Sequence, residues 1–264
     1  MYKIWTYITD PVWNNEFHYD ERLALWSQCK IFVPSLITWS IDDLEEWSEI
    51  VFEEVEFTES RTGYGMNEGK LVSCTGLKHF IQTTYKNIPT YIFDNHNHAL
   101  TFRTKELMAP LIKGEVSADA DGGFEKAKKH LSVIHIDQHT DIKPNTNQLP
   151  ITNYELPITE VEDFVNTQTN VGNFISAALN NWIIDEVIQI RTDYALYNLL
   201  PETCSLKPFI LDIDIDFRVD KEVTPQDIKI IRTLMQQAKL VTIATSPYFM
   251  NQKKAIEIVK QLLK

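Results

Sequence analysis

The sequence predicts an α/β protein with a three-layer α/β/α architecture around a mostly parallel sheet. In the second half of the chain, short segments rich in β-branched residues alternate with segments of helical periodicity. The strand-like segments are almost continuously apolar, as expected of parallel strands that helices cover on both faces. A chain of 264 residues with 44% hydrophobic residues can form one sizeable core, so we expect a single domain over residues 1–264.

The expected elements follow one another regularly from residue 90 onwards. The segment 90–99 has the pattern of a strand followed by a polar turn. Further strands are expected at 130–138, 185–192, 208–217 and 240–249. Helices are expected at 171–183, 224–239 and 252–264. The helix at 224–239 has the clearest start, because Thr224 suits the N-cap, Pro225 the first helical position and Asp227 the first turn.

The first 85 residues and the segment before residue 130 are less regular. The segment 40–54, SIDDLEEWSEIVFEE, is predicted to be a helix with an acidic start. The segment 117–127, SADADGGFEKA, is expected to be a loop before a helix. Asp119 and Asp121 are spaced as in a calcium-binding loop, but the glutamate ligand of such a loop is missing.

Composition excludes several classes of protein. A formal net charge of −12 argues against a nucleic-acid partner, which normally requires a basic surface, and is compatible with metal ions or a cationic substrate. No run of 18 apolar residues and no cleavable signal segment is present, so we expect no membrane association and a cytoplasmic location. The three cysteines, Cys29, Cys74 and Cys204, have neither disulfide-framework nor zinc-ribbon spacing.

Three polar motifs follow apolar strands and carry the chemistry. VIHIDQHTD at 133–141 ends in Asp137, His139 and Asp141, and LDIDIDF at 211–217 contains Asp212, Asp214 and Asp216. The turn DNHNHA at 94–99 adds His96 and His98. Alternate residues of a strand project to one side, about 6.6 Å apart. Ligand sites of parallel sheets lie at the carboxyl ends of the strands, so these side chains are expected to converge there.

Crowded carboxylates need a cation among them. Oxygen and imidazole ligands without thiolates favour manganese, iron(II) or zinc. The formal charge of −4 on Asp137, Asp141, Asp214 and Asp216 would be balanced by two divalent ions, with His139 and one histidine of the upstream turn completing the ligand set. Two such ions can hold a bridging water that ionises near neutral pH.

These motifs, in this order, resemble those of the arginase and agmatinase (ureohydrolase) superfamily. That family has a three-layer α/β/α fold and a binuclear Mn²⁺ site that hydrolyses guanidinium groups to urea. A closer resemblance is to the peptide arginases. Five segments look like those of this group: DNHNHA, HIDQHTD, NVGNFISAAL, LDIDIDF and TIATSPYF. The resemblance implies a hydrolase that converts arginine to ornithine within a ribosomally made precursor peptide, through attack of a metal-bridging hydroxide on the guanidinium carbon.

The resemblance also implies a role for each ligand. Asp137 and Asp214 would bridge both ions. Asp141 and the upstream histidine would complete one ion, with Asp141 also holding the nucleophilic water, while His139 and Asp216 would complete the other. His98 fits the upstream histidine better than His96, because an apolar run follows it, and Asp212 remains the alternative to Asp216.

Several family features have no match in this chain. The GGDHS turn is absent, and no DP follows the DxD motif. The loop histidine that shuttles protons in the family is also missing, and Asn173 could take its place without acid chemistry. Residues that grip the α-carboxylate and α-amine of free arginine are not recognisable, as expected of an enzyme that acts inside a peptide.

Four other functions compete with this one. A hydrolase of free arginine or agmatine would share the chemistry. A deacetylase-like amidohydrolase would use one zinc ion and a tandem histidine pair, which the sequence lacks. A binuclear phosphoesterase would need GNHE and GHxH segments, which are also absent. A non-catalytic metalloprotein that binds a precursor peptide is the fourth, and the missing proton-shuttle histidine favours it.

Overall fold

The computed structural model describes residues 6–8, 31–33, 35–38, 53–59, 70–77, 79–112, 131–149, 158–199, 208–219, 221–247 and 249–264. The loop expected at 117–127, residues 40–52 of the helix expected at 40–54, and two cysteines, Cys29 and Cys204, lie outside them. Glu53 and Glu54 belong to strand β4 (Glu53–Glu59), so the helix prediction is wrong at its end. The alternating sequence EEVEFTE has the period of a strand, and it pairs with β5 (Lys70–Gly76).

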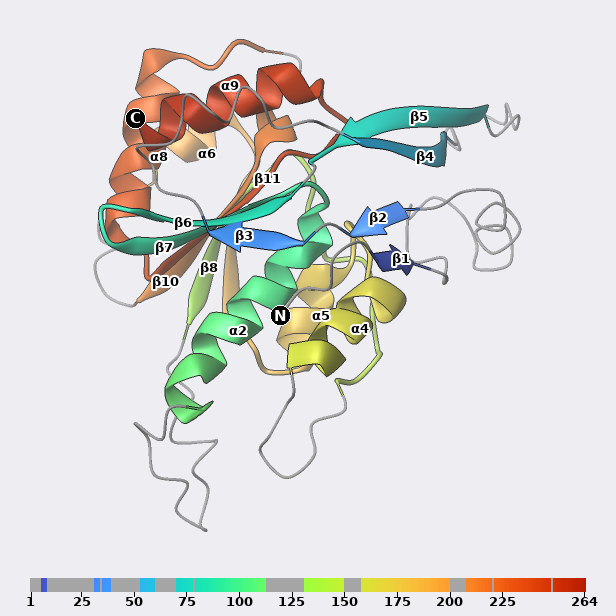
Figure 1. Cartoon of the computed structure of the whole chain (residues 1–264). Helices are drawn as coiled ribbons and strands as arrows, with labels where there is room; N and C mark the ends of the chain where they lie inside the picture. The colour runs from blue at the N-terminus through green and yellow to red at the C-terminus, as the bar shows by residue number, and fades with distance from the viewer. Residues whose placement is uncertain are drawn as a thin grey trace.

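A seven-stranded sheet forms the centre of the molecule, in the order β3-β6-β7-β11-β10-β8-β9 (Figure 1). Five neighbouring strands are parallel: β7 (Ile88–Phe93), β11 (Leu240–Ala244), β10 (Phe209–Asp214), β8 (Ser132–Ile136) and β9 (Glu186–Ile190). At the other edge, β6 (Phe80–Tyr85) runs antiparallel to β7, and β3 (Leu36–Thr38) is parallel to β6. The predicted mostly parallel sheet is confirmed.

Helices cover both faces of the sheet, so the predicted three-layer α/β/α architecture is also confirmed (Figure 1). One face packs against α2 (Ala99–Ile112), α4 (Ile158–Gln168) and α5 (Phe174–Asn180). The other face packs against α6 (Asp193–Tyr197), α8 (Pro225–Gln237) and α9 (Gln252–Leu263). On strand β10, Ile210 joins the first core, whereas Leu211 and Ile213 join the second.

The helix α8 begins as its sequence predicts. The Thr224 hydroxyl accepts a hydrogen bond from the Asp227 N–H, and the Asp227 carboxylate accepts one from the Thr224 N–H, so the two residues form a capping box. Pro225 occupies the first turn. The expected helices at 171–183 and 252–264 correspond to α5 and α9.

Strand β10 ends earlier than the sequence predicts. The expected strand at 208–217 stops at Asp214, and residues Ile215–Arg218 form the 3₁₀ turn η4. The Asp214 carboxylate accepts a hydrogen bond from the Asp216 N–H at 3.0 Å, which curls the chain at this point. This turn brings Asp216 back towards the end of the sheet.

Two small antiparallel sheets complete the described structure. They pair β1 (Thr6–Ile8) with β2 (Ile31–Val33), and β4 with β5. Cys74 lies on β5. None of the helices in the described part of the chain combines the length and apolar character that crossing a bilayer requires.

Candidate metal centre

The predicted motifs meet at the carboxyl ends of neighbouring parallel strands. Asp137 directly follows β8, Asp214 ends β10, and His96 opens the 3₁₀ turn η3 (His96–His98) shortly after β7. Ser246 follows β11, which lies between β7 and β10. This edge of an open parallel sheet is where ligands are normally bound.

A first group of four buried side chains brings ligand atoms together: His96, His135, Asp137 and Asp141. The Nδ1 atom of His96 lies 3.2 Å from both Asp137 Oδ2 and Asp141 Oδ2. The Nε2 atom of His135 lies 3.3 Å from Asp137 Oδ2 and 3.9 Å from Asp141 Oδ2. Two imidazole nitrogens and two carboxylate oxygens therefore face one point.

A second group contains Asp137, His139 and Asp216. His139 Nδ1 lies 3.2 Å from Asp137 Oδ1 and 3.2 Å from Asp216 Oδ2. Asp137 belongs to both groups, with Oδ2 in the first and Oδ1 in the second. One carboxylate thus links two potential ion sites.

The carboxylate of Asp214 borders the first group. Its Oδ2 atom lies 3.1 Å from His96 Nδ1 and accepts a hydrogen bond from the Ser246 hydroxyl at 2.6 Å. Its Oδ1 atom accepts the N–H of Asp216, so Asp214 orients a member of the second group. This position is compatible with the bridging role that the sequence predicts, which remains a prediction.

Two residues at the site have left-handed backbone conformations without being glycine. Asp141 has φ 53° and Ser246 has φ 43°. Such conformations cost free energy and are retained where the surrounding structure enforces them, often at functional sites. The Asp141 carbonyl accepts the Ile175 N–H at the start of α5, which fixes the loop that presents its carboxylate.

The acidic side chains alter one another's protonation. Burial raises the pKa of Asp141 to about 6, and burial together with Asp214 raises the pKa of Asp216 to about 8. The close carboxylates of Asp137 and Asp216 favour the protonated ring and raise the pKa of His139 to about 11. In the absence of another cation, the cluster therefore keeps protons that ordinary aspartates and histidines would release at neutral pH.

The chemistry of the ligand atoms fits a divalent metal ion. Within the described structure, His96 Nδ1, His135 Nε2, Asp137 Oδ2 and both oxygens of Asp216 are buried but have no hydrogen-bond partner. Buried polar atoms normally have one, and converging unpaired nitrogen and oxygen atoms are what a metal ion satisfies. These buried histidines and aspartates could hold a metal ion.

The structure separates the two candidate upstream histidines. His96 belongs to the first group, whereas His98 belongs to neither, although the sequence favoured it. The ring of His98 packs against Phe80 at 4.8 Å between centroids, and burial lowers its pKa to about 3. His98 therefore packs beside the first core, immediately before α2. The apolar residues that follow it, Ala99 and Leu100, belong to that core.

The structure also separates the two alternative aspartates of β10. Asp216 lies in the second group, whereas Asp212 lies one step deeper in the strand, behind the two histidines. Its Oδ2 atom is hydrogen-bonded to His96 Nε2 and His135 Nδ1, on the ring edges that face away from the first group.

Asn173 has a structural role in the turn before α5. It is the N-cap of α5, and its Oδ1 atom accepts a hydrogen bond from the Asn170 N–H at 2.8 Å. The side chain closes the turn before α5, so the structure gives no support to a catalytic role. The next residue, Phe174, is buried and packs against the His96 ring at 4.8 Å between centroids.

Sequence reasoning missed His135. Its signal was present, because His135 alternates with Asp137 and His139 and must share their side of the chain. It was hidden within an apolar run, where a lone histidine suggests packing. Sequence reasoning also missed Ser246, which lies in the segment TIATSPYF and binds Asp214.

The two groups differ in access to solvent. The first group is buried, whereas the His139 side chain is 43% exposed. The His139 ring lies 5.2 Å from that of Phe249, which is also partly exposed. Ile142, next to Asp141, is exposed as well. His139 and Phe249 therefore lie on the solvent side of the candidate metal centre.

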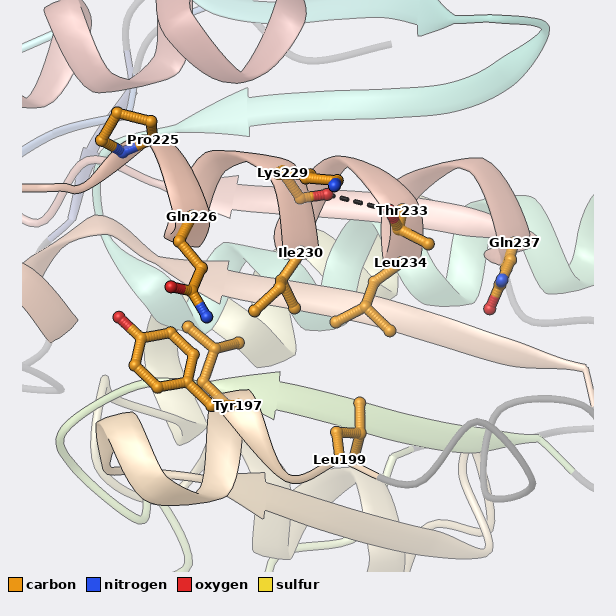
Figure 2. A pocket seen from close by; sticks show the side chains of 10 residues that line it. Tyr197, Leu199, Pro225, Gln226, Lys229, Ile230, Thr233, Leu234 and Gln237 are labelled. Atoms are coloured by element: carbon orange, nitrogen blue, oxygen red, sulfur yellow. Dashed lines mark hydrogen bonds between the residues drawn. The ribbon is translucent and has the colours of Figure 1, made fainter.

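A separate pocket lies between α6 and α8 and shares no residue with either group (Figure 2). Figure 2 shows Tyr197 and Leu199 facing Gln226, Ile230 and Leu234 of α8 across it. It contains none of the candidate metal ligands.

No protein-family model and no curated protein matches the chain.

Proposed function

We propose that the chain is a manganese-dependent hydrolase that converts arginine side chains within a ribosomally synthesised precursor peptide to ornithine, with release of urea. The observation that carries this proposal is the sharing of Asp137 between two groups of oxygen and nitrogen ligands. With His96 as the upstream histidine, the ligands occur in the order that the ureohydrolase pattern requires: His96, Asp137, His139, Asp141, Asp214 and Asp216.

The residues fit a pair of Mn²⁺ ions. Carboxylate oxygens with a few imidazoles and no thiolate suit manganese, and several acidic side chains are available to balance two divalent ions. When bound, such ions acidify a water molecule enough to make it a nucleophile at neutral pH. Guanidinium carbon is a poor electrophile, so this activation would be needed.

The reaction uses one water molecule to hydrolyse the bond between the guanidinium carbon and the side-chain nitrogen. The oxygen of water bonds to that carbon, the bond from carbon to the side-chain nitrogen breaks, and the nitrogen takes up a proton to leave as the ornithine amine. Asp141 is suited to accept a proton from the water, because its carboxylate lies in the first group and burial raises its pKa to about 6. Asn173 has no proton to exchange in this step.

The exposed ring beside His139 suits the side chain of an arginine carried by a peptide. The exposed side chain of Phe249 would contact the methylene groups of an arginyl side chain that reaches past His139. The buried carboxylates of the site would attract the guanidinium group at the end of that side chain. This arrangement does not depend on the free α-amine or α-carboxylate of the amino acid.

A single-ion amidohydrolase is a second candidate, and one observation favours it. The first group alone offers four ligand atoms from His96, His135, Asp137 and Asp141, which is enough for one zinc-type ion. The number of ions per chain at saturation distinguishes this function from the proposed one.

Mass spectrometry tests the proposed reaction. Purified protein with Mn²⁺ is incubated with arginine-containing peptides, including candidate precursors encoded near its gene, while free L-arginine and agmatine are assayed for urea in parallel. The proposal expects peptides to lose the mass of one cyanamide unit per arginine. Urea from free arginine or agmatine alone would assign the protein to ordinary ureohydrolases. Metal binding without any turnover would favour a peptide-binding metalloprotein.

A further inference from the structure

A buried polar layer lies beneath the candidate metal centre and is not part of the ureohydrolase motif. Its centre is Asp212, which is fully buried on β10. In the register of the sheet, Asp212 stands beside His135 of β8 on one side and Thr242 of β11 on the other. The three side chains therefore enter the same face of the sheet, where alternation would otherwise place apolar residues.

Asp212 contacts both histidines of the first group. Its Oδ2 atom lies 2.9 Å from His96 Nε2 and 2.7 Å from His135 Nδ1. Its Oδ1 atom accepts a hydrogen bond from the Thr242 hydroxyl at 2.5 Å. Arg103 of α2, also fully buried, places Nη2 2.5 Å from the same Oδ2 atom.

These contacts determine which ring nitrogens are available. An ionised carboxylate only accepts hydrogen bonds, so the nitrogen of each histidine that faces Asp212 must carry the hydrogen. In the neutral ring, the form that binds a metal ion, the lone pair is then on the opposite atom, His96 Nδ1 or His135 Nε2. Both of these atoms are buried, lack a hydrogen-bond partner and point at Asp137 Oδ2.

The ring planes are fixed as well. The His96 and His135 rings stack with centroids 5.1 Å apart and an interplanar angle of 22°. Phe174 packs against both rings. The Arg103 guanidinium lies over the Phe174 ring at 5.4 Å, and it supplies the positive charge that a buried ionised Asp212 requires.

We propose that His135 is an additional ligand of the ion held by the first group, and that Asp212 is the positioning residue that orients His96 and His135 towards that ion. This inference rests on the proposed metal centre but not on its substrate. It gives the first ion two imidazole ligands, where the ureohydrolase pattern provides one. A carboxylate behind a metal-binding histidine normally sets its tautomer, and here one carboxylate would do so for two histidines.

The test measures metal binding on the full chain, independently of turnover. Asp212→Asn and His135→Phe are freed of metal by dialysis and titrated with Mn²⁺ by calorimetry. We expect each variant to bind the first ion about 10- to 100-fold more weakly than the wild type. The nitrogen modulation in the pulsed electron paramagnetic resonance spectrum of the Mn²⁺-loaded protein should also weaken in His135→Phe, which keeps an aromatic ring for stacking but removes the nitrogens.

Asp227→Asn is the matched control. Asp227 is likewise fully buried and paired with an arginine, Arg218, at 2.6 Å, but it belongs to neither metal group. Its variant should lose thermal stability and bind Mn²⁺ like the wild type. If Asp212→Asn fails to fold, Thr242→Val provides a milder variant, because it removes only the Thr242 hydroxyl that donates a hydrogen bond to Asp212 Oδ1. A smaller loss of Mn²⁺ affinity is then expected.

The outcomes separate this inference from the proposed function. Wild-type affinity and unchanged nitrogen modulation in His135→Phe would overturn the role of His135. Wild-type affinity in a folded Asp212→Asn, or in Thr242→Val if the former does not fold, would overturn the positioning role. A wild-type protein that binds no Mn²⁺ would overturn the metal centre itself. Peptide turnover could fail while all the metal measurements agree with the inference, and only the proposed reaction would then be wrong.

Discussion

Asp137 Oδ2 lies 3.2 Å from His96 Nδ1, while the other oxygen of Asp137 accepts a hydrogen bond from the His139 N–H. The two oxygens of this carboxylate therefore face different groups of ligands. Asp137 can take this position because it directly follows strand β8, next to the end of β10. Loss of Asp137 should consequently affect both groups at once.

We predict that Asp137→Asn abolishes binding of a metal pair and lowers turnover by at least about a hundredfold, since loss of even an outer partner of a metal ligand costs 10- to 100-fold. Metal content after gel filtration and product formation by mass spectrometry measure the two effects. Asp163→Asn, at an exposed position of α4, is the control and should match the wild type. An active Asp137→Asn variant with a full metal complement would exclude the assignment.

Metal binding should release protons and become tighter as the pH rises. The neighbouring carboxylates of Asp137 and Asp216 raise the pKa of His139 to about 11, and burial raises that of Asp216 to about 8. Both groups thus hold protons at pH 7 in the metal-free protein, and a ligand must lose its proton to bind. Apparent affinity for Mn²⁺ should increase between pH 6 and about 8.

Calorimetry in buffers with different ionisation enthalpies measures this release, because the observed heat then varies with the buffer. The same titration of Asp216→Asn, which has no carboxyl proton to lose, should show fewer protons released. Binding heats that are independent of the buffer at pH 7 would contradict the prediction.

The Asp227 carboxylate should stabilise the fold through contacts that are separate from the site. It accepts hydrogen bonds from the Thr224 N–H and the Tyr197 hydroxyl and pairs with Arg218. Arg218 keeps a second carboxylate partner, Asp193, in this variant, so Asp227→Asn should lower the free energy of unfolding by about 1–3 kcal/mol at pH 7. Denaturant unfolding measures the difference.

This contribution should depend on pH in a defined direction. Burial alone would raise the pKa of Asp227, but its hydrogen bonds and Arg218 lower it below the ordinary value. A carboxyl group with a lowered pKa in the folded state stabilises the protein above the unfolded pKa, about 4, and loses this effect as the pH falls further. The stability gap between wild type and Asp227→Asn should therefore narrow below about pH 4. A stability difference that widened below pH 4 would contradict this prediction.

Phe249 should contribute to substrate binding and not to metal binding. Its exposed ring lies beside that of His139, and burial of a phenylalanine side chain is worth about 1.5–3 kcal/mol. If the arginyl side chain covers part of this ring, Phe249→Ala should lower kcat/KM for the peptide by about tenfold, which corresponds to ~1.4 kcal/mol. Steady-state kinetics with saturating Mn²⁺ tests this. An unchanged kcat/KM would place the substrate elsewhere.

Much of the fold follows from local sequence signals. The apolar strand β8 and the amphipathic helices α8 and α9 were predicted from periodicity, and the Thr224 cap was predicted from residue type. The prediction of a helix at 40–54 is wrong at Glu53 and Glu54, which lie in strand β4. Its acidic residues suit a helix start, but pairing with β5 decided the conformation there.

The site was predictable where a motif ends a strand, as at Asp137 and Asp214. The choice between His96 and His98 depended on the 3₁₀ turn η3, which separates their side chains, and spacing alone does not reveal such a turn. The roles of Asp212 and His135 depended on the register between β10 and β8, which is a tertiary property. Sequence alternation shows which side a residue faces but not which residue of another strand lies beside it.

Electron paramagnetic resonance of the wild-type protein loaded with two equivalents of Mn²⁺ tests most directly whether Asp137 joins two ion sites. A carboxylate that bridges two adjacent ions should produce the spectrum of an exchange-coupled manganese pair, and Asp137→Asn should lose it. A wild-type spectrum that contains only isolated Mn²⁺, or saturation at one ion per chain, would contradict the binuclear centre.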